Sequence, residues 1–336
     1  MIKTIFQIIS DIHLEFLSQN DAEQLFNKIK LNKSETETIT KSVTITKSAI
    51  TTESTSTTIT DSESTSVTTT ELNLILAGDI GHPSDPKYEN FLETCTKIYD
   101  NVFLITGNHE YYSKQNPLSI EDTNQMIEEI CSKLNSANLV NPSPNQSPNQ
   151  SPNPSNPDLI PSNPSNPSNK FGKIHFLNNK MILYNNIYII GSTLWSYVDP
   201  SKFDTKTNMN DYNYIKDFTP ELSNELWQKN RKFISDSIDM VRSAKKTDPN
   251  IRCLVITHHL PSFHLINSKY KSCTDINHFF ASDMDDLIIE PVDYWIYGHT
   301  HMASKIIHNG VNLICNPLGY SSESSNFDHN CLIKIV

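Results

Sequence analysis

The sequence has few glycines, few arginines and no long apolar run. Its 336 residues include only eight glycines and three arginines, and its net charge is −11. This charge disfavours binding to duplex nucleic acid, because such binding relies on a basic face that neutralises phosphates. No segment approaches the roughly 20 apolar residues that a membrane-spanning helix needs. We therefore expect neither a membrane nor a duplex nucleic acid as a partner.

The sequence also lacks paired cysteines, and its first residues do not predict a secretion signal. Its six cysteines are scattered singly, with no C-x-x-C spacing, which is typical of reduced thiols or core residues. The apolar stretch after Lys3 spans only five or six residues and is interrupted by Gln7. It is shorter than the apolar core of a signal peptide, which has about 7–15 residues. We therefore expect a cytoplasmic protein.

Five short apolar runs, rich in β-branched or aromatic residues, are predicted to be buried strands. They are residues 5–9, 72–77, 102–105, 253–256 and 294–297. Each run is followed by side chains that bind metals well. The carboxyl ends of the strands form a common crevice in an open α/β sheet, so segments far apart in sequence can converge there. The pattern predicts an α/β fold with a metal site at the strand ends.

The metal-binding side chains fall into five strings. They are Asp11-Ile12-His13, Gly78-Asp79, Gly107-Asn108-His109-Glu110, Thr257-His258-His259 and Gly298-His299-Thr300-His301. Each string alone is weak, because Asp or His after a strand often caps a turn. Together, the five favour a site that holds two metal ions rather than one. Hydrolysis of a phosphate ester is therefore the leading hypothesis.

These strings resemble the signature blocks of the calcineurin-like metallophosphoesterase superfamily. The similarity to small stand-alone members extends to residues 191–195, 257–262 and 315–320. It covers residues 4–31, 72–140 and 171–336. The resemblance implies a four-layer α/β/β/α sandwich of two mixed sheets, with a dinuclear metal centre at the carboxyl ends of the strands.

The resemblance also implies seven ligands for two metal ions. They are Asp11, His13 and His301 on the first ion, Asn108, His258 and His299 on the second, and Asp79 as a bridge between them. Carboxylates mixed with imidazoles suit divalent transition metals such as Mn, Fe, Zn or Ni better than Mg or Ca. Two ions about 3.5–4 Å apart can deprotonate a bridging water, and the resulting hydroxide would be the nucleophile.

Three further histidines have candidate roles. His109 is expected to be the general acid, because a positioned imidazole can protonate a departing alkoxide near neutral pH. The alternative is a histidine satisfied by a backbone carbonyl. His259 and His82 are candidate substrate contacts. Alternatively, His259 only orients His258, and His82 only occupies a surface turn before Pro83.

One block departs from the superfamily pattern. Many members read Gly-Asp-x-x-Asp-Arg, whereas this chain reads Gly78-Asp79-Ile80-Gly81-His82-Pro83. The aspartate that often supports the catalytic histidine is missing, and so is the arginine that would hold a phosphate with two parallel hydrogen bonds. Purple acid phosphatases would have a metal-bound tyrosine at the place of His82. These differences argue against a protein Ser/Thr phosphatase and against a purple acid phosphatase.

Two segments lack the apolar residues of a packed domain. Residues 32–71 are dominated by Ser, Thr, Glu and Lys, and residues 141–169 repeat Asn, Pro and Ser. We predict that both are disordered insertions in one domain that spans residues 1–336, because closure entropy grows slowly with loop length. Amphipathic helices are predicted at residues 220–244 and after Ser119, which has the spacing of a helix cap.

The favoured function is metal-dependent hydrolysis of a phosphate monoester or diester. A small phosphorylated substrate is compatible with an acidic chain, because bound metal ions supply positive charge locally. A non-catalytic scaffold or protein-interaction module on the same fold is the alternative, which the missing Asp-Arg pair keeps open. A nuclease fits the negative charge less well. The sequence identifies no protein partner.

Overall fold

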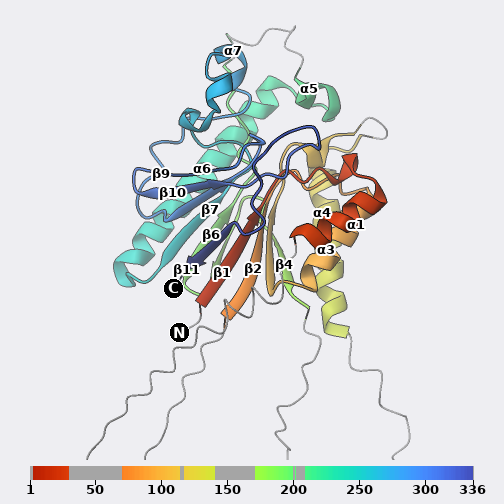
Figure 1. Ribbon diagram of the computed structural model, residues 1–336. Coiled ribbons are helices and arrows are strands. Elements are labelled where there is room, and N and C mark those ends of the chain that lie inside the picture. Colours follow the sequence, from red (N-terminus) through yellow and green to blue (C-terminus); the bar gives the residue numbers. More distant parts are fainter. Residues whose placement is uncertain are drawn as a thin grey trace, which may run out of the picture.

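The strands of the predicted metal site belong to two mixed sheets (Figure 1). The computed structural model describes residues 3–29, 70–113, 117–140, 171–199, 201 and 209–335. The predicted insertions at 32–71 and 141–169 lie outside this part, except that Thr70 and Glu71 begin a strand. No helix among the described residues is long and apolar enough to cross a membrane.

The first sheet has the strand order β11-β1-β2-β3-β4. Its strands are β1 (Lys3–Ile9), β2 (Thr70–Ala77), β3 (Asn101–Ile105), β4 (Lys173–Phe176) and β11 (Leu332–Ile335). Strands β1 to β4 are parallel to their neighbours, and β11 pairs antiparallel with β1. The carboxyl ends of β1, β2 and β3 therefore lie at one edge, opposite the chain ends marked in Figure 1.

The second sheet has the order β5-β6-β7-β8-β10-β9. Its strands are β5 (Lys180–Tyr184), β6 (Ile187–Gly191), β7 (Arg252–Ile256), β8 (Tyr294–Tyr297), β9 (Ser304–His308) and β10 (Val311–Cys315). The four central strands are parallel, and the edge strands β5 and β9 pair antiparallel. All five predicted strands are confirmed, three in the first sheet and two in the second.

Helices cover the outer face of each sheet. Those beside the first sheet are α1 (Gln19–Ile29), α3 (Pro86–Thr96) and α4 (Ile120–Val140), and α6 (Pro220–Thr247) covers the second. Both predicted helices are confirmed. Thr219 caps α6 by accepting a hydrogen bond from the Leu222 amide, with Pro220 in the first turn. Such a cap satisfies an amide that has no partner within the helix.

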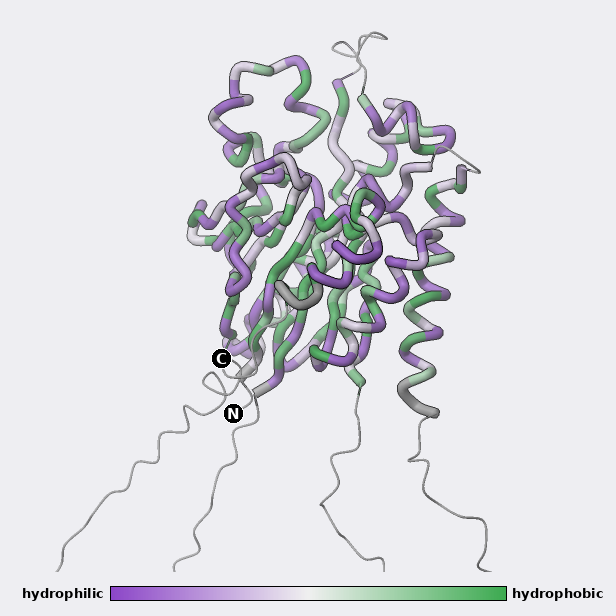
Figure 2. The backbone as a smooth tube through the Cα atoms, turned by 45° about the vertical axis from the view of Figure 1, so that its right-hand side comes forward, coloured by the Kyte–Doolittle hydropathy of each residue, from purple (hydrophilic) through white to green (hydrophobic). Residues whose placement is uncertain are grey.

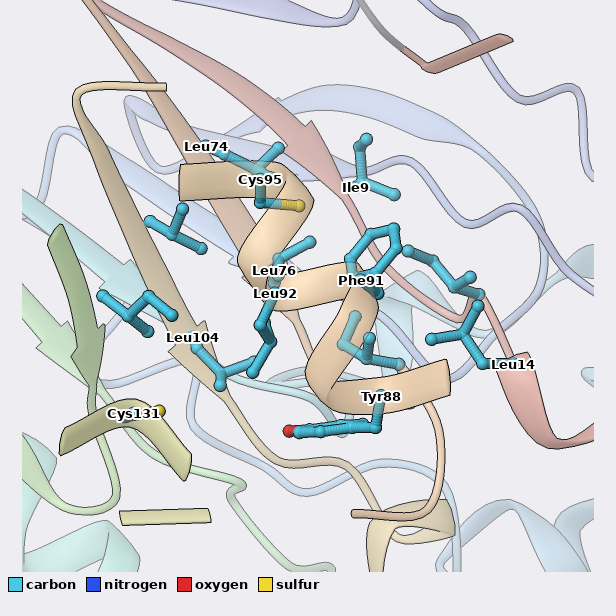
Figure 3. Packing of buried hydrophobic residues seen from close by; sticks show 14 of the residues in the cluster. Ile9, Leu14, Leu74, Leu76, Tyr88, Phe91, Leu92, Cys95, Leu104 and Cys131 are labelled. Carbon is cyan, nitrogen blue, oxygen red and sulfur yellow. The ribbon is translucent and has the colours of Figure 1, made fainter. Parts of the chain in front are cut away.

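Alternating side chains of the strands build the layers. In β2, Leu74 and Leu76 belong to the core cluster beneath α3, which Figure 3 shows together with Phe91, Leu92 and Cys95. Ile75 and Ala77 point the other way, into a core between the two sheets. Hydrophobic residues accordingly run along the central strands, as the hydropathy colours of Figure 2 show. The four-layer α/β/β/α sandwich is therefore confirmed.

Short elements surround the strand ends where the predicted ligands lie. They are the 3-10 turns η1 (Leu14–Phe16), η2 (His109–Tyr111), η3 (Phe263–Leu265) and η4 (Ser268–Tyr270), and the helices α5 (Asn210–Tyr214) and α7 (Thr274–Asn277). Turn η1 directly follows the first string, and η2 begins at His109 inside the third, so their backbone sets the direction of the neighbouring side chains.

Candidate metal centre

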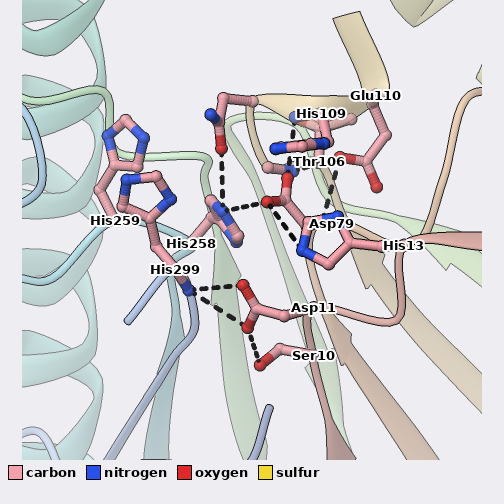
Figure 4. Close-up of polar contacts among 12 residues, drawn as sticks. Ser10, Asp11, His13, Asp79, Thr106, His109, Glu110, His258, His259 and His299 are labelled. Carbon is pink, nitrogen blue, oxygen red and sulfur yellow. Dashed lines mark hydrogen bonds and ion pairs between the residues drawn. The ribbon is translucent and has the colours of Figure 1, made fainter. Parts of the chain in front are cut away.

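The five strings of the sequence meet at the carboxyl ends of both sheets. The first sheet supplies Asp11 and His13 after β1, Asp79 after β2, and Asn108 after β3; the second supplies His258 after β7, and His299 and His301 after β8. His299 and His301 are half-buried, and the other five are buried. Figure 4 shows Asp79 between His13 and His258.

One group of possible ligand atoms comes from Asp11, His13, Asp79 and His301. These atoms all lie within 4.8 Å of one another. His13 Nε2 is 3.0 Å from His301 Nε2 and 3.9 Å from Asp79 Oδ2. His301 Nε2 is 3.5 Å from Asp11 Oδ1. Two imidazole nitrogens and two carboxylates therefore converge on one point.

A second group comes from Asp79, His258 and His299, whose ligand atoms also lie within 4.8 Å of one another. His258 Nε2 is 3.2 Å from Asp79 Oδ2 and 3.2 Å from Asn108 Oδ1. Asp79 belongs to both groups. The structure thus brings together all seven residues that the sequence singled out, in two sets that share one carboxylate.

The backbone at these residues is strained. Five of the seven have a positive φ: Asp11 (52°), His13 (54°), Asp79 (55°), His299 (67°) and His301 (47°). Residues with a Cβ rarely adopt this left-handed conformation, and each strained conformation costs on the order of 1–3 kcal/mol. Such strain collects at functional sites, where surrounding contacts maintain it. Here the left-handed backbone directs the side chains of these five residues toward a common centre.

Gly107 allows the two sheets to approach at the centre. A Cβ at this position would lie 2.1 Å from Asp79 Oδ1 and 2.6 Å from His258 Nε2. Neither atom can move away without leaving its own group. The position before Asn108 therefore has no room for a Cβ atom, and only glycine fits there.

Hydrogen bonds hold the ligand atoms in place. His258 Nδ1 donates to the Ala77 carbonyl at 2.9 Å, which leaves Nε2 to face Asp79. The Asp11 carboxylate accepts from the His299 amide at 2.9 Å. Buried Glu110 accepts from the amides of Gly107, Asp79 and Ile80, at 2.7, 3.1 and 2.8 Å. Glu110 thereby joins the strings after β2 and β3.

The electrostatics of the cluster favour a cation at its centre. Burial opposes ionisation of Asp79, but the charges of His258 and His109 outweigh burial and hold the pKa of Asp79 well below its usual range. Burial likewise opposes protonation of His258, yet Asp79 raises the pKa of His258 to about 10. The buried carboxylates therefore attract positive charge, which either a proton or a metal ion can supply.

His299 provides a direct test of whether the donor set fits a metal. Burial and the neighbouring His259 lower the pKa of His299 well below its usual value, so the imidazole is neutral. Its Nε2 is buried and has no hydrogen-bond partner among the described residues. An unpaired buried nitrogen is costly, and a neutral imidazole lone pair is the form that ligates a metal. The residues present thus fit a metal centre.

His109 lies beside this centre. Its backbone amide donates to Asp79 Oδ1 at 2.8 Å, its Nδ1 is 2.9 Å from Glu15 Oε1, and its Nε2 is 3.2 Å from the Tyr320 hydroxyl. Burial would lower the pKa of His109, but the charge of Asp79 and the hydrogen bond to Glu15 outweigh burial and raise it. The imidazole can therefore carry a proton at an edge of the cluster.

The two candidate substrate histidines lie elsewhere. His259 is buried behind His299, with ring centroids 4.3 Å apart, and its Nδ1 is 3.2 Å from Ser196 Oγ. His82 lies in a local turn, where its Nδ1 accepts from the Ser84 amide at 3.2 Å. Neither residue lines the cavity described next. Their roles as substrate contacts remain predictions.

A cavity of about 450 Å³ opens beside the cluster. Its lining includes the polar residues Asp79, Asn108, His109, His299 and His301, and the apolar residues Met209, Leu260, Ile266, Ile276 and Phe280. Three tyrosines, Tyr112, Tyr270 and Tyr320, complete the lining together with several amide side chains. No lysine or arginine among the described residues lines it. A cavity of this volume is large enough for a small ligand.

Sequence reasoning missed several residues around the cluster. Glu110 is the last residue of the third string, directly after His109, and Glu15 lies two residues after His13, the end of the first string. This proximity to a histidine was the available signal. Asp211 accepts a hydrogen bond from Asn108 Nδ2 at 2.8 Å and another from the Tyr112 hydroxyl. No motif marks Asp211, because α5 follows the strand of Asn108 by about a hundred residues.

The two-sheet sandwich and its strand-end cluster of carboxylates and imidazoles define the architecture of a metallophosphoesterase. A family model for calcineurin-like phosphoesterases matches residues 6–303. The chain belongs to this family, and the resemblance noted in the sequence is confirmed. Membership supports metal-dependent hydrolysis of phosphate esters in general.

Two solved structures and one sequence relative are similar to the chain. Phosphopantetheinyl hydrolase from Mycobacterium tuberculosis is 10% identical, with a TM-score of 0.53 over 99% of this chain and 96% of that one. A putative 5'-nucleotidase from Staphylococcus aureus in complex with alpha-ketoglutarate is also 10% identical, with a TM-score of 0.39 over 94% of this chain and 48% of that one. An uncharacterized protein of Acanthamoeba polyphaga mimivirus is 28% identical over 98% of this chain and 96% of the relative.

Proposed function

We propose that this chain hydrolyses phosphate esters with the help of two divalent transition-metal ions, such as Mn, Fe, Zn or Ni. The observation that carries the proposal is the pair of ligand groups that share Asp79. A carboxylate common to two imidazole-rich groups suits two neighbouring cations rather than one. The buried Nε2 of His299 adds a possible ligand atom, because it has no hydrogen-bond partner among the described residues.

The residues would divide between the ions as the family pattern suggests. Asp11, His13 and His301 would hold the first ion, Asn108, His258 and His299 would hold the second, and Asp79 would contact both. When bound, two such ions supply positive charge to the phosphoryl oxygens and lower the pKa of the attacking water. The chain itself keeps the ligands oriented through the Ala77 carbonyl, the His299 amide and Glu110.

His109 would be the general acid of the reaction. It lines the cavity next to Asp79 and Asn108, and the charge of Asp79 and the contact with Glu15 favour its protonated form. As the bond between phosphorus and the ester oxygen breaks, a proton would pass from His109 Nε2 to that oxygen. General acid catalysis of this kind contributes about 10²–10⁴ in rate.

The cavity wall favours a particular kind of substrate. The apolar side chains of Met209, Ile266, Ile276 and Phe280 line the cavity together with the candidate ligands. Burial of apolar surface against such side chains stabilises binding by roughly 25 cal/mol per Å². We therefore favour esters whose alcohol part is uncharged and largely apolar. The Mycobacterium tuberculosis enzyme is 10% identical and shares only the fold. Its substrate is therefore not assigned to this chain, and phosphopantetheinyl esters serve only as test compounds.

The alternative is a non-catalytic scaffold on the same fold. It is favoured by His82 and Pro83, which stand where many family members have the Asp-Arg pair. No arginine among the described residues replaces that phosphate-binding side chain in the cavity lining. A scaffold would bind metal without turning over any ester.

A substrate panel on metal-loaded protein separates these functions. The chelated chain would be reloaded with Mn, Fe, Zn or Ni and assayed with p-nitrophenyl phosphate, bis-p-nitrophenyl phosphate, alkyl phosphates and a phosphopantetheinyl ester. We expect turnover that disappears on chelation and returns with metal. Absence of turnover with every ester and every metal would leave the scaffold as the better account.

A further inference from the structure

Glu15 lies between two histidines of the site. Its Oε1 is 2.9 Å from His109 Nδ1 and 3.3 Å from His13 Nδ1. The Glu15 side chain is 20% exposed, and the side chains of His109 and His13 are 10% and 1% exposed. One carboxylate oxygen therefore contacts the Nδ1 atoms, here called the inner nitrogens, of the candidate acid His109 and of the candidate ligand His13 at the same time.

The fold builds this position from the strings after β1 and β2. His13 and Leu14 donate backbone hydrogen bonds to the carbonyls of Asp79 and Ile80, both at 2.9 Å. These bonds fix turn η1, which carries Glu15. A Cβ at Gly81 would lie 2.9 Å from Leu14 Cβ and 3.4 Å from Glu15 Oε2. The absence of a side chain at Gly81 thus leaves room for the turn and its carboxylate.

The position matters because the expected support of His109 is missing. Family members that read Gly-Asp-x-x-Asp-Arg have an aspartate where this chain has His82, and His82 bonds to Ser84 instead. An imidazole without a partner on its inner nitrogen is free to rotate and to change tautomer. In this chain, a carboxylate from a different segment contacts that nitrogen.

We propose that Glu15 is the positioning residue of His109 and takes the place of the missing aspartate; the inference rests on the proposed phosphoesterase function. The Nδ1–H of His109 donates to Glu15, which turns Nε2 toward the cavity, where the Tyr320 hydroxyl lies 3.2 Å away. During the reaction, the bond between phosphorus and the ester oxygen breaks, and the proton moves from His109 Nε2 to that oxygen. Glu15 itself exchanges no proton with the substrate.

The same geometry admits a different role. Ligand atoms of His13, Glu15 and His109 lie within 4.8 Å of one another, so this trio could hold a metal ion. In that case Glu15 and His109 would both be ligands. A count of metal ions per chain distinguishes this role from positioning, because positioning requires no ion at the trio.

The test uses the dependence of the rate on the leaving group. An acid catalyst matters for poor leaving groups and hardly matters for p-nitrophenolate, which departs without a proton. With saturating metal, we expect Glu15→Ala to lower kcat about 10–100-fold for alkyl phosphates, to change p-nitrophenyl phosphate turnover less than about 3-fold, and to leave KM nearly unchanged. Glu15→Gln keeps an acceptor and should retain more activity than Glu15→Ala.

A readout without metal or substrate complements the kinetics. Long-range ¹H–¹⁵N spectra of the metal-free chain report which nitrogen of His109 carries a proton, with the signal assigned by its loss in His109→Gln. We expect an Nδ1–H held in a hydrogen bond in the wild type and a mixture of tautomers in Glu15→Ala. The matched control is Glu93→Ala, which removes an exposed glutamate paired with Lys97 at 2.8 Å on α3, and it should change neither spectrum nor rate.

Three outcomes would overturn the inference. The first is a Glu15→Ala variant that loses rate equally for all leaving groups. The second is an unchanged His109 tautomer in Glu15→Ala. The third is the loss of a bound metal ion in Glu15→Ala. A wild-type chain that hydrolyses no ester contradicts both the proposed function and the inference. If the wild type hydrolyses esters but Glu15→Ala lowers kcat equally for all leaving groups, only the proposed role of Glu15 is contradicted.

Discussion

Asn108 Nδ2 donates to Asp211 Oδ1 at 2.8 Å, although the two residues are 103 positions apart. The bond leaves the amide oxygen of Asn108 to face His258 Nε2 at 3.2 Å. Asp211 also accepts from the Tyr112 hydroxyl and is buried. A carboxylate beyond the predicted ligand set therefore decides which atom of Asn108 faces the second group.

Asp211→Ala should weaken binding of one metal ion and spare the other. Without its acceptor, Asn108 can turn its amide nitrogen toward His258, and loss of such an orienting contact typically costs about 10–100-fold in metal affinity. Isothermal titration of the metal-free chain with Zn or Mn measures both affinities. Asp217→Ala, six residues away and exposed, is the control. Equal affinities in both variants would contradict the orienting role.

Gly107→Ala should abolish metal binding through steric conflict. A methyl group 2.1 Å from Asp79 Oδ1 must displace that carboxylate, and overpacking of this kind typically costs about 1–3 kcal/mol. Gly310→Ala is the control, because a Cβ there meets nothing within 4 Å while φ is +83°. The free energy of unfolding of Gly310→Ala should fall by about 1 kcal/mol through backbone strain, and this variant should keep its metals. Thermal unfolding and metal analysis check both; a Gly107→Ala chain with full metal content would refute the steric argument.

His109→Ala should keep its metals and lose rate. The side chain is assigned to proton transfer, so kcat for alkyl phosphates should fall about 10²–10⁴-fold, with unchanged metal content in elemental analysis. His264→Ala removes a histidine whose side chain is 70% exposed and should leave both quantities unaltered. If His109→Ala instead loses metal, the residue is a ligand and the acid must be sought elsewhere.

Ile276→Ala should reduce selectivity for apolar esters. Ile276 lines the cavity wall and is 39% exposed, so its truncation leaves the core intact. Removal of part of an apolar wall changes kcat/KM by about 10-fold, which we expect for octyl phosphate and not for methyl phosphate. Ile307→Ala on β9, 73% exposed and outside the cavity lining, is the control. The same ratio of octyl to methyl phosphate turnover in both variants would argue against an apolar substrate.

Much of the fold was predictable because its central strands are buried on both faces. Such strands appear as continuous apolar runs, and metal-binding side chains at their ends mark the carboxyl edge of each sheet. The start of β2 was less visible. Thr70 and Glu71 fall in the polar stretch predicted as an insertion, yet they pair with Lys3 and Thr4 of β1. Backbone pairing does not require apolar side chains, so composition did not reveal it.

The contacts around the candidate ligands were harder to predict. Nothing in the sequence distinguishes Glu15 from a surface glutamate, and the left-handed turn at His13 directs it toward His109. Asp211 meets Asn108 only because α5 returns to the strand ends of the first sheet. Ligand types and order can be inferred from local strings, whereas the partners that orient them depend on tertiary contacts between distant segments.

The number of metal ions per chain tests the central claim most directly. Elemental mass spectrometry of the purified, reloaded chain should find two divalent transition-metal ions per chain. Asp79→Ala should lower the content of both, because Asp79 belongs to both ligand groups. A wild-type chain that holds a single ion, or an Asp79→Ala chain that retains two, would contradict a dinuclear centre bridged by Asp79.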